Sequence, residues 1–261
     1  MWREAEALVR AKDHRGSCDT LRRVSDVRTL PVSEIVAVTP RSRLVALDLH
    51  GDTFAFTAGQ AIFVGDHGQP ARRPYSIASS PERALESGRL ELLIGVDAAG
   101  SAGPHLVLRG GELVDVEGPL GTFTFPSTVP QRRLLFVAGG TGIAPLRAML
   151  DHALRTHPAE RVSLLYSARR ADEFAFADEL REYERQGRLE FHPTVTREDE
   201  AWAGGRGRIG RAHFEAVLHD RGDTLCFICG PGSLVTEAVT TLSQLGVPRG
   251  AIRTEEWAAP R

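Results

Sequence analysis

Residues 136–149 read FVAGGTGIAPLRAM, and this stretch indicates how the second half of the chain folds. An apolar run ends at Gly139 and Gly140, the chain turns through Gly142, and Pro145 stands in the first turn of a predicted helix. Glycine lets the backbone turn tightly and approach a ligand, and a helix start offers unpaired N–H groups with a partial positive charge. The loop suits a pyrophosphate, although it departs from G-x-G-x-x-G and such a turn can need glycine for packing alone.

Alternation of strands and helices continues from residue 132 to the end of the chain. Apolar runs such as RVSLLYSA and DTLCFICG alternate with helical patterns such as ADEFAFADELREYERQG. This alternation predicts a doubly wound α/β domain with a parallel sheet over residues 132–261. A second glycine turn, CGPGSLV from Cys229, also follows a strand and begins a helix. Both turns therefore lie at carboxyl ends of parallel strands, where open α/β sheets bind ligands, and together they predict a dinucleotide site.

The first half of the chain, residues 31–127, has a different pattern of apolar and turn residues. Short β-type runs, among them EIVAVT, RLVALDL, AIFVG and RLELLIGV, are separated by clusters of Gly, Pro and Asp. This pattern predicts a six-stranded antiparallel β-barrel or sandwich. Residues 1–30 fit neither half, and we expect a helical extension whose apolar side chains suit a docking or dimer contact.

Composition excludes several classes of protein. The 261 residues are 42% hydrophobic and 25% charged, which is enough material for two globular domains. A net charge of -2 gives no basic field for nucleic acid, and no apolar run approaches the ~20 residues of a membrane span. The charged N-terminus lacks the apolar segment of a secretory signal, so we expect a cytoplasmic protein.

The cysteines do not indicate a disulfide framework or a metal site. There are three, Cys18, Cys226 and Cys229, and an odd, low count argues against disulfides. The CFIC segment reads as a buried strand, on which residues three apart point to opposite faces. We therefore expect no bound metal.

Two polar stretches of the first half stand out. Residues 72–81, RRPYSIASSP, fit either an ordinary strand edge or a cradle for a flat, negatively charged ligand. The guanidinium of an arginine can pair with a phosphate, the ring of the tyrosine can stack on a flat ligand ring, and the hydroxyl of a serine can hydrogen-bond to a ring nitrogen. Residues 97–106, DAAGSAGPHL, approach the G-x-S-x-G of serine hydrolases around Ser101, but their antiparallel setting and Pro104 argue against that elbow. We expect a turn into one short helix whose start could face a phosphate.

In their order along residues 31–257, these segments resemble the ferredoxin–NADP reductase family of flavoproteins. The R-x-Y-S motif of that family matches residues 73–76. The resemblance implies that Arg73 pairs with the flavin pyrophosphate, that Tyr75 lines the flavin ring or ribityl chain, and that Ser76 hydrogen-bonds near flavin N5. GSAGPHL occupies the place of the second flavin-phosphate segment, with Gly103 where the family has Ser or Thr, so backbone N–H groups would serve there.

The resemblance also assigns the nicotinamide side of the site. GGTGIAP matches the pyrophosphate loop, and CGPG matches the segment that holds the nicotinamide, with Cys229 beside the reacting ring. The ending EEW implies that Trp257 covers the flavin and that Glu255 is the nearby carboxylate. Thr196-Arg197 resembles the Ser-Arg pair that NADPH-using members place on the 2′-phosphate, and Arg206 falls near a later basic position, so we expect NADPH rather than NADH.

The resemblance implies a flavoprotein oxidoreductase that transfers hydride from NAD(P)H to bound FAD and passes electrons to ferredoxin, flavodoxin or free flavin. The alternative is an electron-transfer subunit docked to an oxygenase or dehydrogenase; three scattered cysteines cannot supply the iron–sulfur cluster that such subunits often carry. The predicted catalytic residues are Ser76, Cys229, Glu255 and Trp257. The predicted cofactor-binding residues are Arg73, Pro74, Tyr75, Ser76, Gly100, Ala102, Gly103, Gly139, Gly140, Thr141, Gly142, Pro145, Thr196, Arg197, Arg206, Cys229, Gly230, Pro231 and Trp257.

Overall fold

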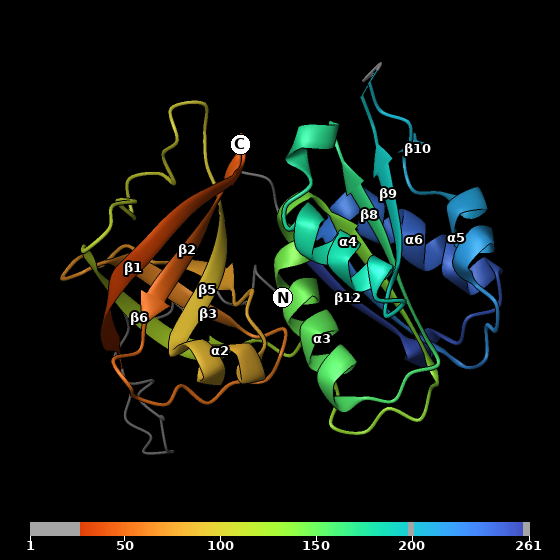
Figure 1. The fold of residues 1–261 in the computed structure, drawn as a ribbon, viewed down its shortest axis with the longest axis horizontal. Coiled ribbons are helices and arrows are strands. Elements are labelled where there is room, and N and C mark those ends of the chain that lie inside the picture. The colour runs from red at the N-terminus through yellow and green to blue at the C-terminus, as the bar shows by residue number, and fades with distance from the viewer. Residues whose placement is uncertain (1–26, 198–200, 258–261) are drawn as a thin grey trace, which may run out of the picture.

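The computed structural model describes residues 27–197 and 201–257, and these residues form two six-stranded sheets (Figure 1). Neighbouring strands are antiparallel in the first sheet and parallel in the second. This arrangement confirms the predicted fold class, an antiparallel N-terminal domain followed by a doubly wound α/β domain. Within the described residues, none of the helices has the length and apolar character needed to cross a membrane.

The first sheet has the strand order β4-β3-β6-β1-β2-β5. An isolated bridge between Ile77 and Leu92 joins the two ends of this order, so the sheet closes as a barrel. Alternate side chains of β5, including Leu90 and Ile94, are fully buried in it, as expected for strands with one face on a core. The elements are β1 (Arg28–Thr39), β2 (Ser42–Asp48), β3 (Ala61–Asp66), β4 (Arg73–Ser76), α2 (Pro81–Ser87), β5 (Arg89–Gly95) and β6 (Leu113–Leu120).

Two expectations for the first half were wrong in part. Strand β1 begins at Arg28, so residues 28–30 of the predicted helical extension are strand, while residues 1–26 lie outside the described part. Residues 101–110 contain no helix. The Asp97 carboxylate accepts bonds from the amides of Ala99 and Ser101, each at 2.9 Å, and the Val107 amide donates to Asp66 at 2.8 Å. Aspartate side chains thus take the amides that a helix would need.

The second sheet has the strand order β10-β9-β8-β7-β11-β12. The sequence of strands reverses between β7 and β11, and such a topological switch point is where open α/β sheets bind ligands. Both glycine turns follow these two strands. The elements are β7 (Arg133–Gly139), η1 (Gly140–Gly142), α3 (Ile143–Thr156), β8 (Arg161–Ala168), η2 (Ala171–Glu173), α4 (Ala177–Arg185), β9 (Glu190–Val195), β10 (Gly205–Arg206), α5 (Arg211–Val217), β11 (Thr224–Pro231), α6 (Gly232–Gln244), η3 (Arg249–Ala251) and β12 (Ile252–Trp257).

One predicted helix is interrupted. The pattern over residues 171–187 forms a short η2 turn, and α4 begins only at Ala177. The break occurs at Phe176, whose φ of 62° lies in the left-handed region, uncommon for a residue with a bulky side chain. Helix α3 lies at the junction of the two domains, next to α2 (Figure 1).

Candidate active site

A cleft of about 780 Å³ opens between the barrel and the carboxyl ends of the parallel strands. Its volume falls in the range of cofactor and substrate pockets. Both domains line it, and the sequence predictions meet here: the predicted site residues along its wall are Arg73, Ala102, Gly103, Gly139, Gly140, Thr141, Thr196, Pro231 and Trp257. Arg197 and Arg206 do not line the cleft, and neither do Ser76, Cys229 and Glu255.

The R-x-Y-S motif forms β4, which pairs with β3. Pro74 is tolerated because β4 stands at one end of the strand order and a proline cannot donate to an inner ladder. The two arginines before the tyrosine differ in their surroundings. Arg72 donates to the buried Asp115 at 3.2 Å, whereas Arg73 lines the cleft and forms no ion pair with the residues that the structure describes. Arg73 is therefore the cation available to an anionic ligand.

Tyr75 has a partner that the sequence did not indicate. Its Oη lies 2.6 Å from Nε2 of His105, and the two rings stack with centroids 6.0 Å apart. Burial raises the pKa of Tyr75 to about 12 and lowers the pKa of His105, so the pair is a neutral phenol and a neutral imidazole. His105 thereby fixes the plane of the Tyr75 ring.

The turn that follows β5 offers less to a phosphate than expected. The N–H of Gly103 donates to Ser101 Oγ at 3.0 Å, so it is already occupied. The Ala102 N–H has no such partner among the described residues, and it remains available beside Arg73. Gly100 and Gly103 have φ of 81° and 108°, which explains the glycines in this turn.

The first glycine loop packs closely against the second. Gly140 has φ of 54°. A Cβ on Gly142 would lie 2.3 Å from the Cys229 carbonyl oxygen, and one on Gly139 would lie 2.6 Å from Leu234, so these glycines let the two loops pack together. Packing therefore accounts for Gly139 and Gly142, while the turn at Gly140 leads into the N-terminus of α3, where anions bind. The buried Tyr166 hydroxyl donates to the Gly140 carbonyl at 3.2 Å and steadies the turn.

Four predicted residues meet where β11 and β12 end. Cys229 pairs with Glu255 in the ladder, and Pro231 pairs with Trp257. Cys229 Sγ lies 4.0 Å from Glu255 Oε2, and both side chains are buried. Burial raises the pKa of Glu255 to about 7 and that of Cys229 well above its ordinary value. Cys229 is therefore a neutral thiol rather than a nucleophilic thiolate, and Glu255 exchanges a proton near neutral pH.

The residues fit a bound flavin and a bound dinucleotide. Four arginines line the cleft, Arg41, Arg73, Arg169 and Arg208, which suits phosphate groups. Arg41, in the β1–β2 turn, was missed because a turn arginine carries no pattern in an arginine-rich chain. Nε1 of Trp257 is buried and has no hydrogen-bond partner among the described residues, so the cleft holds a free donor beside the glycine loop.

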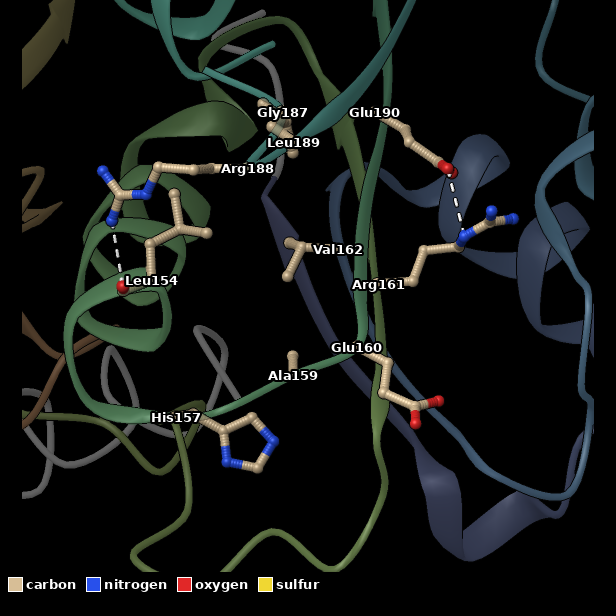
Figure 2. A pocket seen from close by; sticks show the side chains of 10 residues that line it. All are labelled: Leu154, His157, Ala159, Glu160, Arg161, Val162, Gly187, Arg188, Leu189 and Glu190. Carbon is tan, nitrogen blue, oxygen red and sulfur yellow. Dashed lines mark hydrogen bonds and ion pairs between the residues drawn. The ribbon is translucent and has the colours of Figure 1, made fainter.

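A second hollow lies at the amino ends of the parallel strands, opposite the cleft, and is not this site. It has a volume of about 470 Å³. Figure 2 shows its lining residues, which come from the C-terminal end of α3 and the starts of β8 and β9. Its arginines are engaged: Arg188 donates to the Leu154 carbonyl at 2.9 Å, and Arg161 pairs with Glu190 at 3.1 Å. None of the predicted site residues lines it. Nor do the described residues contain a cluster of His, Cys, Asp and Glu suited to a metal ion.

The fold and cleft define an oxidoreductase that binds a flavin on a barrel and a nicotinamide dinucleotide on an α/β domain. Comparison with known families agrees: an oxidoreductase FAD-binding domain matches residues 29–125, and an oxidoreductase NAD-binding domain matches residues 136–240. The chain is 33% identical over 241 residues to ferredoxin–NADP reductase B of Sorangium cellulosum, covering 86% of this chain and 96% of that protein. The chain therefore belongs to the ferredoxin–NADP reductase family, and it is a flavoprotein that transfers electrons between NAD(P)H and FAD, as predicted.

Other relatives show how widely the fold is used. The reductase component of phenol 2-monooxygenase from Pseudomonas sp. strain CF600 is 28% identical over 229 residues, which are 85% of this chain and 62% of that protein. Among solved structures, the Amycolatopsis reductase GcoB superposes with a TM-score of 0.76 at 28% identity, covering 93% of this chain and 73% of that one.

Replacing Trp257 by alanine is expected to tighten binding of the nicotinamide dinucleotide and to raise oxidase leakage. A covering ring must be displaced before nicotinamide reaches the flavin, and an aromatic contact contributes roughly 0.5–1.5 kcal/mol, or about two- to tenfold in affinity. Titration with NADP⁺ and oxygen consumption measure both effects, and Trp257→Phe, which keeps a ring, is the control. Unchanged affinity and leakage in Trp257→Ala would contradict a covering role.

Proposed function

We propose that this chain is an NADPH-dependent reductase that passes electrons from its FAD to a separate one-electron carrier such as ferredoxin or flavodoxin, in the cytoplasm. The observation that carries the proposal is one shared cleft, which Arg73 of the barrel lines together with residues of both glycine turns and Trp257 of the α/β domain. Similarity over 96% of the length of a ferredoxin–NADP reductase supports the choice of acceptor.

In the proposed mechanism, the residues of this chain bind FAD and the nicotinamide dinucleotide, orient them and shield them from water. When bound, FAD and the nicotinamide dinucleotide supply the hydride and electron chemistry. Arg73 and the Ala102 N–H would hold the flavin pyrophosphate, and Tyr75, fixed by His105, would pack against the flavin. The turn at Gly140 and the start of α3 hold the dinucleotide pyrophosphate. Trp257 would shield the flavin from water.

Glu255 and Ser76 are the residues that we expect to bind and release the proton exchanged at flavin N5. Glu255 is buried and burial raises its pKa to about 7, so it can hold or release a proton at physiological pH. Ser76 ends β4 and would supply a hydroxyl that can donate and accept in turn. The neutral Cys229 thiol positions the nicotinamide and does not attack it.

The test is direct. The purified protein should be yellow and release one FAD per chain, identified by mass, and it should reduce ferredoxin or flavodoxin with NADPH. A colourless protein that binds no added flavin would overturn the proposal.

A reductase component of an oxygenase is the second candidate, favoured by the similarity to the phenol 2-monooxygenase component. Light scattering after size-exclusion chromatography separates the two. A monomer with high kcat/KM for free ferredoxin supports the first candidate, whereas activity that appears only with a tightly bound oxygenase supports the second.

Glu255 should make the stability of the protein depend on pH. Burial raises its pKa from 4.5 to about 7 in the folded state, so folding favours the protonated form. Its contribution is fully present below pH 4.5 and is lost as the pH rises through about 7. Melting temperatures measured from pH 5 to 8 should therefore fall more steeply for the wild type than for Glu255→Gln. Parallel curves would contradict a buried, titrating Glu255.

A further inference from the structure

Arg147 is a buried cation that the mechanism above does not use. It lies in α3, five residues after Gly142, and only 3% of its surface is exposed. Its guanidinium bridges the domains: Nη1 donates to the Ala78 carbonyl at 3.0 Å and to Glu91 at 2.6 Å, both in the flavin domain. Nη2 and Nε donate to Glu179 of α4, at 2.7 and 3.1 Å.

Asp151, one turn further along α3, forms a second bridge. Its carboxylate accepts from Ser80 Oγ at 2.5 Å and from Tyr183 Oη at 2.8 Å. Arg83 of α2 lies between Asp151, at 3.4 Å, and Glu179, at 3.0 Å. Although burial alone would raise the pKa of Asp151, the bond from Ser80 and the charge of Arg83 hold it well below its ordinary value, so the carboxylate stays ionised.

We call these residues the interdomain clamp: Arg147, Asp151 and Glu179 from the α/β domain with Ser80, Arg83 and Glu91 from the flavin domain. A buried ion pair is weak evidence for stability, because desolvation offsets much of the attraction. A guanidinium is, however, a rigid planar fork whose donors point in fixed directions. The clamp therefore permits one spacing between the segments that it joins.

Those segments carry the two halves of the active site. Ala78 follows Ser76 by two residues, and α3 begins directly after the glycine loop. The Arg147 guanidinium also lies 4.2 Å from the ring centroid of Phe176, the residue held in a left-handed conformation at the start of α4. Such a conformation persists where the surroundings over-determine it.

We propose that Arg147 is a positioning residue for hydride transfer: through Glu91 and the Ala78 carbonyl, it sets the distance between the flavin-binding strand and the dinucleotide loop. Transfer requires reacting atoms about 3–3.5 Å apart, and a displacement of about 1 Å can slow a reaction a hundredfold. The inference rests on the proposed function, because it concerns how the two rings are held together. A purely structural role for Arg147 would change stability and leave the geometry of the bound rings unaltered.

The experiment compares wild type with Arg147→Met, Arg147→Lys and Glu91→Gln, all loaded with FAD. Arg161→Met is the matched control, because Arg161 pairs with Glu190 within the α/β domain, at the start of β8 (Figure 2). Three quantities are measured: the rate of flavin reduction after rapid mixing with saturating NADPH, the long-wavelength charge-transfer absorbance with NADP⁺ bound to reduced enzyme, and the melting temperature.

Arg147→Met is expected to reduce flavin about tenfold more slowly and to lose the charge-transfer absorbance, with FAD content unchanged. Arg147→Lys should recover little, because an ammonium cannot span both carboxylates and the carbonyl. Glu91→Gln removes only the charge that pairs with Arg147 across the domains, so it should show a smaller loss of the reduction rate and of the charge-transfer absorbance. If Arg147→Met does not fold, the Glu91→Gln variant tests the inference instead. Wild-type absorbance and rate in Glu91→Gln and in any folded Arg147 variant would overturn the inference. A wild type that binds no FAD or is not reduced would instead refute the proposed function.

Discussion

Replacement of Arg73 by alanine is expected to weaken FAD binding about ten- to hundredfold. A charge-assisted hydrogen bond contributes roughly 1.5–3 kcal/mol, which corresponds to that range of affinity. Arg73 is the cation of β4 that lines the cleft, and it is not paired with any carboxylate in the part of the chain that the structure describes. In the neighbouring turn Gly103 has no side chain and its N–H already donates to Ser101, so less remains to compensate.

Arg72 provides the matched control. It stands next to Arg73 in sequence but donates to the buried Asp115 and does not line the cleft, so Arg72→Ala should lower stability and keep FAD affinity. Quenching of flavin fluorescence on titration of the apoprotein measures both variants. If Arg73→Ala binds FAD within twofold of wild type, or if Arg72→Ala loses it instead, the pyrophosphate assignment is wrong.

The sequence predicted the parts of the site that depend on local pattern. The strand–glycine–helix stretch at residues 136–149 identified β7, η1 and α3, because an apolar strand, a turn and an amphipathic helix each leave a periodic trace in neighbouring residues. The R-x-Y-S strand was instead predicted by its resemblance to the family motif, because residues 72–81 by themselves fitted either a strand edge or a cradle for a ligand.

The parts that were missed depend on partners far apart in the chain. Arg147 looks like a surface residue of a helix, and it is buried only because Glu91 and Glu179 reach it from 56 and 32 residues away. His105 gave no signal because its partner, Tyr75, lies 30 residues upstream. The short helix expected after Gly103 failed for the same reason, since Asp66 captures the amide of Val107 from 41 residues away.

The second large effect is expected at the adenosine end of the cleft, where NADPH should be preferred to NADH. The donors differ by a 2′-phosphate, so the preference must come from cations near the ribose. Thr196, Arg169 and Arg208 line this part of the cleft. Arg197, named by resemblance, donates its backbone N–H to the Arg169 carbonyl at 2.9 Å, and its side chain is not part of the lining. We therefore expect Arg169 and Arg208 to contribute more than Arg197.

Acidic residues oppose this preference. Glu173 and Glu237 also line the cleft, and a carboxylate near the ribose favours NADH by accepting from its 2′-hydroxyl. The balance should still favour NADPH if both guanidinium groups reach the phosphate, because each such contact contributes roughly 1.5–3 kcal/mol. Glu237→Gln should then strengthen the preference further, which a surface carboxylate unrelated to the ribose would not do.

Steady-state kinetics with both donors decide between these assignments. Arg208→Ala and Arg169→Ala should each lower kcat/KM for NADPH about ten- to hundredfold and leave NADH nearly unchanged, because NADH lacks the group that they bind. Arg197→Ala should have a smaller effect; if it alone removes the preference, the cleft-lining pair is not the phosphate site. A wild type that prefers NADH would mean that Glu237 or Glu173 accepts a hydrogen bond from the ribose 2′-hydroxyl and that the arginines do not bind a 2′-phosphate. The expectation of NADPH would then be wrong.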